Sequence, residues 1–176
     1  LYLSAGQGIG SGLVFSGNVF KGSLGTAGEI GHTSVDLNGP LCRCGNNGCL
    51  ELYTSSLALL RNLGKDWQNI SSQPISFEEV VVAYKNRNPS VLKEVSRVAQ
   101  YLAQGLVNSI NLMNPDLIVL GDEYSKFGDS FLENIKIHIQ KKILPNVFKN
   151  INFQLAPQTD LVIGGSFHHV IQNEML

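Results

Sequence analysis

The chain has 176 residues, enough for one domain with a sizeable core; hydrophobic residues make up 43% of it and charged residues 15%. This composition excludes general intrinsic disorder, and a formal net charge of −1 gives no overall basic field of the kind that nucleic-acid binding usually needs. No apolar run approaches the length of a membrane span, and no signal peptide precedes the first predicted strand.

The N-terminal part predicts short strands joined by glycine-rich turns. The predicted strands are residues 1–5, 13–16, 19–20 and 32–37. Gly17-Asn18 is typical of a hairpin turn. The first turn, residues 6–12, contains Gly6, Gly8 and Gly10, so its backbone N–H groups are bare and can cradle an anion such as phosphate. The alternative is a tight hairpin that needs glycine only for its backbone angles.

All three cysteines, Cys42, Cys44 and Cys49, lie in one short segment, and His32 precedes them. This Cys3His set suits a tetrahedral zinc ion with no open coordination position, which indicates a structural metal. Three buried cysteines without metal, or a disulfide, are the alternatives. The intervening residues are Arg, Gly and Asn, which have little apolar surface to bury, and a disulfide would leave one cysteine over. Thiolates reserved for a metal fit a reducing cytoplasm.

Two acidic residues flank this segment. Glu29 lies close to His32 along the chain, and Glu51 follows the last cysteine. Carboxylates accept hydrogen bonds and imidazole can donate or accept, so these three side chains suit the hydroxyl groups of a sugar. A metal on one ring nitrogen of His32 would leave the other for the ligand. The alternative is that both carboxylates are solvated surface charges.

The rest of the chain alternates predicted helices and strands. The predicted helices are 50–63, ended by Gly64; 76–85, opened by Ser76; 90–113, ended by Asn114-Pro115; 125–143, ended by Pro145; and 164–176, opened by Gly164. Strands are predicted over 116–120 and 152–156, and a polar linker over 65–75. A β-meander followed by alternating helices and strands indicates an α/β fold with a mixed sheet.

Four segments together resemble a known family. They are Gly6-Gln7-Gly8-Ile9-Gly10-Ser11-Gly12, Ala27-Gly28-Glu29-Ile30-Gly31-His32, Cys42 to Glu51, and Asn114 to Gly121. The pattern resembles the ROK family of bacterial repressors and sugar kinases. The resemblance implies a single C-terminal lobe, residues 1–176, of an actin-like, hexokinase-like (ribonuclease H-like) ATPase fold, with a mixed sheet, flanking helices and a zinc loop. It also implies that Glu29, His32 and Glu51 contact the sugar and that His32, Cys42, Cys44 and Cys49 hold zinc.

Within the family, residues 31–53 are most similar to xylose-repressor-type members. Kinases of the family use an aspartate base from an Asn-Asp segment and an Asp-x-Gly-x-Thr phosphate turn, both in the N-terminal lobe. Neither motif occurs in this sequence, which we expect to start after them. Asp122 stands where the kinases tend to have a second glycine after Gly121. Under a kinase interpretation, Gly6, Gly8 and Gly10 would bind phosphate, Gly121 and Gly164 would bind nucleotide, and ATP and magnesium would be cofactors. The departures favour a repressor.

We therefore expect the sugar-binding and oligomerisation part of a transcriptional repressor of carbohydrate-utilisation genes, with no catalytic residue in this chain. The alternative is the C-terminal lobe of an ATP-dependent sugar kinase of the glucokinase or fructokinase type. A start at Leu1 without Met indicates a piece of a longer protein. Expected partners are a monosaccharide, a second copy in a homodimer or tetramer formed through helices 90–113 and 125–143, and DNA only through an N-terminal domain outside the chain.

Overall fold

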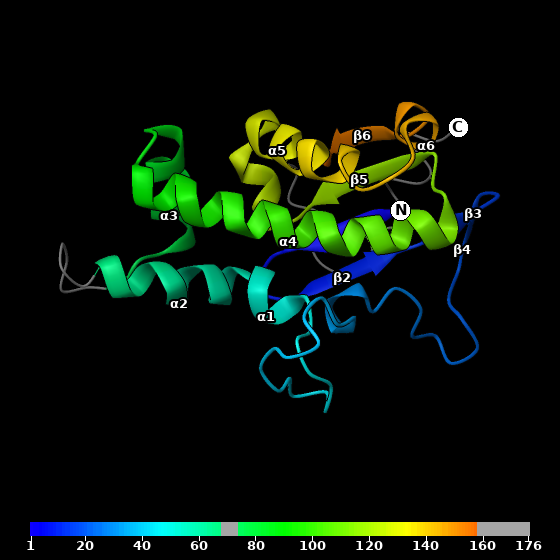
Figure 1. Cartoon of the computed structure of the whole chain (residues 1–176), viewed down its shortest axis with the longest axis horizontal. Coiled ribbons are helices and arrows are strands. Elements are labelled where there is room, and N and C mark those ends of the chain that lie inside the picture. Colours follow the sequence, from blue (N-terminus) through cyan, green and yellow to red (C-terminus); the bar gives the residue numbers. More distant parts are fainter. Residues whose placement is uncertain (68–73, 158–176) are drawn as a thin grey trace.

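The computed structural model describes residues 1–67 and 74–157 (Figure 1). The predicted helix over 164–176, and Gly164 with it, lies outside the described residues. In the part of the chain that the structure describes, no helix combines the length and apolar character needed to cross a membrane.

The structure contains a mixed sheet, as predicted, and this sheet has four strands. Its strands are β1 (Tyr2–Ala5), β2 (Ile9–Gly12), β5 (Leu117–Gly121) and β6 (Asn152–Leu155), in the order β2-β1-β5-β6. β1 is antiparallel to β2 and parallel to β5, and β5 is parallel to β6. Ser4 lies opposite Gly121, so the carboxyl ends of β1 and β5 lie side by side.

The longest helix, α4 (Pro89–Met113), packs beside α5 (Asp129–Gln140) over the sheet (Figure 1). Asn88 caps α4 by accepting hydrogen bonds from two backbone amides, and Asn114 ends it in the left-handed conformation. The predicted apolar positions of α4 are all buried in the core: Val91, Val95, Val98, Leu102, Leu106 and Ile110. The apolar face of α4 is thus buried in the core of its own chain. α3 (Phe77–Lys85) begins with the predicted Ser76 cap, which forms a capping box with Glu79.

The strand predicted over 32–37 is wrong. This region contains a 3-10 helix, η1 (Ile30–His32), and one isolated bridge between Ser34 and Cys49. Its backbone bonds go to the cysteine segment instead of the sheet, because the amide of Val35 donates to the carbonyl of Gly48. The alternation of residue types does not correspond to an alternation of burial, since Leu37 is exposed.

The helix predicted over 50–63 is two helices, α1 (Glu51–Thr54) and α2 (Ser56–Trp67). Ser55 has an extended backbone between them, and its hydroxyl accepts a hydrogen bond from the amide of Ala58. Gly64 does not end α2, since one glycine costs only about 1 kcal/mol relative to alanine inside a helix. The predicted helix over 125–143 is also shorter: η2 (Glu123–Phe127) and Gly128 precede α5.

Three smaller boundaries differ from the prediction. Residues 9–12 of the predicted glycine turn form β2. The hairpin of β3 (Val14–Phe15) and β4 (Asn18–Val19) turns at Ser16-Gly17, one residue earlier than expected. Pro145 opens another helix, α6 (Pro145–Lys149), because proline fits the first position of a helix, where no N–H bond is lost.

Candidate metal and sugar site

The structure brings the four predicted metal ligands together. The ligand atoms of His32, Cys42, Cys44 and Cys49 all lie within 4.8 Å of one another. Nδ1 of His32 is 3.7 Å from Sγ of Cys42, and the Sγ atoms of Cys44 and Cys49 are 3.5 Å apart. Tetrahedral zinc, with bonds of about 2.3 Å to sulfur and about 2.0–2.1 Å to nitrogen, requires separations of roughly 3.8 Å between sulfurs and roughly 3.5 Å between sulfur and nitrogen. These two separations are within about 0.3 Å of the required ones, and the Cys3His donor set is of the kind that binds a tetrahedral ion.

A tight backbone turn presents the first two cysteines. The amide of Gly45 donates to the carbonyl of Cys42 over 2.9 Å, and the amide of Cys42 donates to the carbonyl of Asn46 over 2.8 Å. Gly48 then passes against the preceding segment at a φ of 63°, where an added Cβ would lie 1.7 Å from the carbonyl oxygen of Asp36. Only glycine allows this crossing, which delivers Cys49 to the cluster.

The thiols of the cluster differ in acidity. Burial raises the pKa of Cys49 to about 12, and the neighbouring thiols Cys44 and Cys42 add to the shift. A hydrogen bond from the backbone of Asn46 is the main cause that lowers the pKa of the exposed Cys44. A cation at the centre of the cluster would supply the positive charge that deprotonates coordinating thiols.

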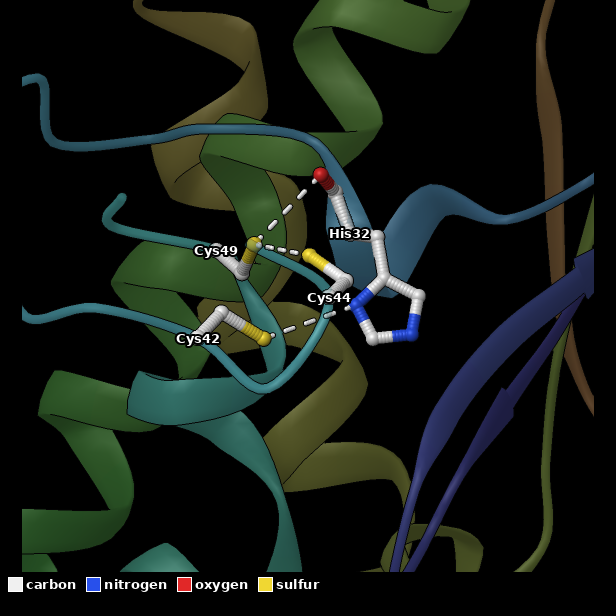
Figure 2. A group of neighbouring side chains, drawn as sticks. All are labelled: His32, Cys42, Cys44 and Cys49. Carbon is white, nitrogen blue, oxygen red and sulfur yellow. Dashed lines mark hydrogen bonds between the residues drawn. The ribbon is translucent and has the colours of Figure 1, made fainter. Parts of the chain in front are cut away.

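His32 presents its two ring nitrogens in different directions. Figure 2 shows Nδ1 facing the sulfur atoms and Nε2 pointing away from them. If Nδ1 binds a metal, the proton must reside on Nε2, which then becomes a hydrogen-bond donor of fixed orientation. The ring orientation leaves Nε2 available to a ligand, and the role of His32 toward a sugar stays a prediction.

Glu51 is held between the cysteine loop and the first glycine turn. Its Oε2 accepts a hydrogen bond from the amide of Ile9 over 3.2 Å, and its Oε1 forms an ion pair with Arg43 over 3.3 Å. The Glu51 side chain is 14% exposed, whereas that of Arg43 is 78% exposed. A Cβ on Gly8 would lie 3.3 Å from Oε2, so the turn approaches this carboxylate closely.

The two predicted sugar carboxylates have different surroundings. Glu51 is fixed and largely buried, while Glu29 is exposed at the start of η1. Glu51 therefore has defined partners in the structure, and the roles of Glu51 and Glu29 toward a sugar both stay predictions. Arg43 was not singled out from the sequence. Its position between two metal ligands is the only signal that could have drawn attention to it.

Fewer backbone N–H groups of the first glycine turn are free than the sequence suggests. The amide of Gly6 donates to the carbonyl of Gly8 over 3.1 Å, and that of Ile9 donates to Glu51. Gly10 faces Ser4 in the ladder between β1 and β2. Gly121 ends β5 beside this turn.

Residues 1–160 match the sequence model of the ROK family. The chain belongs to the ROK family. It is 33% identical over 172 residues to a xylose repressor of Caldicellulosiruptor bescii, a match that covers 93% of this chain and 43% of that protein.

Two solved ROK structures have the same fold. The first, a ROK family transcriptional regulator described as a homologue of the E. coli MLC protein, has a TM-score of 0.83 and 27% identity, covering 91% of this chain and 42% of that one. The second, a ROK hexokinase from Thermus thermophilus, has a TM-score of 0.76 and 26% identity, covering 90% of this chain and 52% of that one. These similarities confirm the hexokinase-like fold with its mixed sheet and flanking helices. The chain spans about half the length of these ROK relatives, or less.

Proposed function

We propose that the chain is the sugar-effector-binding part of a ROK transcriptional repressor of carbohydrate-utilisation genes, within a longer cytoplasmic protein. The similarity to a xylose repressor supports this proposal, and so does the higher TM-score with the transcriptional regulator, 0.83, than with the hexokinase, 0.76. Xylose is the first sugar to test. A net charge of −1 leaves DNA binding to a separate N-terminal domain.

The proposal of a sugar site rests mainly on the position of Glu51. A carboxylate held by Ile9 on one side and Arg43 on the other keeps lone pairs for ring hydroxyls at a fixed place. Nε2 of His32 would donate to the same sugar, and Glu29 would accept from it. A site with both acceptors and a donor suits a polyhydroxyl ligand, because each sugar hydroxyl can donate and accept.

We further propose that the ion held by His32, Cys42, Cys44 and Cys49 is a structural zinc. Four protein ligands would fill its coordination sphere, so it would supply folding energy and no catalysis. It would lock the loop that carries Arg43 and fix the tautomer of His32. The metal would thereby position the sugar site without touching the sugar.

Sugar binding would act on the DNA-binding part through a change of conformation. In this proposal the chain supplies one side of the sugar clamp, and a second lobe closes over the other side. A sugar that binds the closed state better shifts the population toward it, and away from the form that binds DNA. Affinity in the isolated chain should then be weaker than in the full-length protein.

Self-association into a dimer or tetramer belongs to the same proposal, and closed two-fold dimers are the commonest assembly. The apolar face of α4, on which this expectation was based, is buried inside the chain. Contacts between copies would therefore have to use other surfaces. Sedimentation at tens of micromolar would measure it.

The second candidate is the C-terminal lobe of an ATP-dependent sugar kinase, favoured by the similarity to the ROK hexokinase. Phosphoryl transfer depends on a base, a metal and positioned phosphates. The Asn-Asp and Asp-x-Gly-x-Thr motifs, which kinases of the family carry in the N-terminal lobe, do not occur in this chain, so we expect no phosphoryl transfer by the chain alone. We expect a coupled assay of this chain alone with ATP, magnesium and a panel of hexoses and pentoses to stay at background. Turnover that is lost when a residue of this chain is mutated would support the kinase.

Calorimetric titration of the full-length protein with xylose, glucose and fructose tests the proposed function. Saturable binding of one sugar, with release of operator DNA at the same concentration, is the expected result. Binding of no sugar, or sugar binding that leaves DNA affinity unchanged, would contradict the proposal.

A further inference from the structure

Asp122 has a backbone conformation that is unusual for a residue with a side chain. It follows β5 with a φ of 65° and a ψ of −156°, a region occupied almost only by glycine. Its carbonyl accepts hydrogen bonds from the amide and hydroxyl of Ser125, which hold η2 in place. Glycine would adopt this conformation without strain. Strain of this kind persists where the side chain has a task.

The carboxylate of Asp122 lies on the first glycine turn. Oδ2 accepts a hydrogen bond from Oγ of Ser4 over 2.9 Å, and Oδ1 accepts one from the amide of Glu123 over 3.0 Å. A Cβ on Gly6 would lie 3.1–3.3 Å from the three carboxyl atoms. Since Ser4 pairs with Gly121, this carboxylate sits where β1 and β5 end together.

The other side of the turn carries a second carboxylate. Oε2 of Glu51 accepts from the amide of Ile9 and lies close to Gly8. The glycine turn is therefore flanked by two carboxylates of the same chain: Asp122, near Gly6, and Glu51, near Gly8, which is paired with Arg43. Phosphate oxygens brought to this turn would meet like charges at short range.

We infer that Asp122 excludes phosphate groups from the glycine turn at the ends of β1 and β5. The residue acts as a specificity determinant: it occupies the approach to Gly6 with a fixed negative charge. The inference deepens the proposed function, on which it rests for its purpose, because a sugar sensor gains from ignoring the polyphosphates of nucleotides.

Three variants of the chain test the inference. Asp122→Asn removes the charge and keeps the shape; Asp122→Gly removes both and suits the backbone angles. Asp116→Asn is the matched control, since it removes one negative charge beside the opposite end of β5. Each is titrated with inorganic tripolyphosphate by calorimetry at low ionic strength, where charge effects are least screened. Circular dichroism checks that each variant is folded.

We expect no saturation by wild type or Asp116→Asn in the millimolar range, and at least tenfold tighter binding by Asp122→Asn or Asp122→Gly. Equal binding by the wild type, or no binding by either Asp122 variant, would overturn the inference. Sugar titrations of the full-length wild type keep the two proposals apart. A gain of tripolyphosphate binding in the variants, without sugar binding by the wild type, would support the role of Asp122 and contradict the sensor.

Discussion

The phenol of Tyr53 donates a hydrogen bond to Oδ2 of Asp36 over 3.0 Å, and so joins α1 to the segment that precedes the cysteines. The Tyr53 ring stacks on Tyr101 of α4 with 4.4 Å between centroids. Gly39 approaches the same phenol, since a Cβ there would lie 2.2 Å from the Tyr53 oxygen. One side chain therefore fastens the cysteine loop to the longest helix.

Tyr53→Phe should lower the free energy of unfolding at neutral pH by about 0.5–1.5 kcal/mol, the usual contribution of one hydrogen bond. Burial and the bond to Asp36 raise the pKa of Tyr53 from 10.0 to about 12. Above pH 10 the unfolded chain loses this proton while the folded chain keeps it. The stabilisation is thus present below pH 10 and is lost as pH rises toward 12. Urea unfolding of both proteins between neutral and alkaline pH measures the difference, and a difference that does not shrink would contradict the assignment.

Gly48→Ala should disrupt the cysteine loop far more than Gly45→Ala. Both glycines have a positive φ, 63° for Gly48 and 91° for Gly45, so both substitutions cost strain of about 1–3 kcal/mol. Only at Gly48 would the new methyl group meet a backbone oxygen, that of Asp36, whereas nothing lies within 4 Å at Gly45. Urea unfolding and metal analysis of the two variants make the comparison. Equal losses of stability and of metal would contradict the close crossing.

Protein purified without chelator should contain one zinc per chain. Addition of a chelator should lower the Tm of the wild type, because an ion that binds only the folded state stabilises it. Cys44→Ser should lack zinc and show no further response to chelator. Cys44 is exposed, so its loss leaves the core intact and reports on the metal.

Asn47→Ala, in the same exposed loop but outside the ligand set, is the control and should keep its zinc. A wild type that is fully folded without zinc, and whose Tm does not change on addition of chelator, would contradict the structural-zinc proposal.

The features that the sequence predicts well are those built from neighbouring residues. α4 follows from its apolar spacing, its Asn88 cap and the Asn114-Pro115 stop, all of which act within a few residues. The cysteine cluster is also a local pattern, because three of its four members lie within eight consecutive residues and η1 brings His32 alongside.

The features that the sequence misses depend on distant partners. The break between α1 and α2 at Ser55 interrupts a helical pattern because the amide of Ser56 donates to the carbonyl of Gly6 in the first turn. The segment at 32–37 alternates like a strand, yet it pairs with the cysteine loop. Asp122 has no motif that predicts its contact with Ser4, because that contact exists only once β1 and β5 are paired.

Glu51→Gln in the full-length protein should weaken sugar binding while leaving zinc content and DNA binding intact. The amide keeps the shape of the side chain and loses the charge that strengthens hydrogen bonds from ring hydroxyls and from Arg43. Loss of a charge-assisted hydrogen bond is worth roughly 1.5–3 kcal/mol, about tenfold to over a hundredfold in affinity. Calorimetry gives the sugar affinity, and a DNA-release titration shows whether the switch is lost with it.

Glu133→Gln is the matched control for this experiment. Glu133 also pairs with a basic residue, Lys136, but on the exposed surface of α5, where an ion pair contributes little. Its loss should leave sugar affinity and DNA release unchanged. If Glu51→Gln behaves like this control, Glu51 does not contact the sugar. The site would then have to be sought away from the cysteine loop, because Glu51 is the residue that links that loop to the glycine turn.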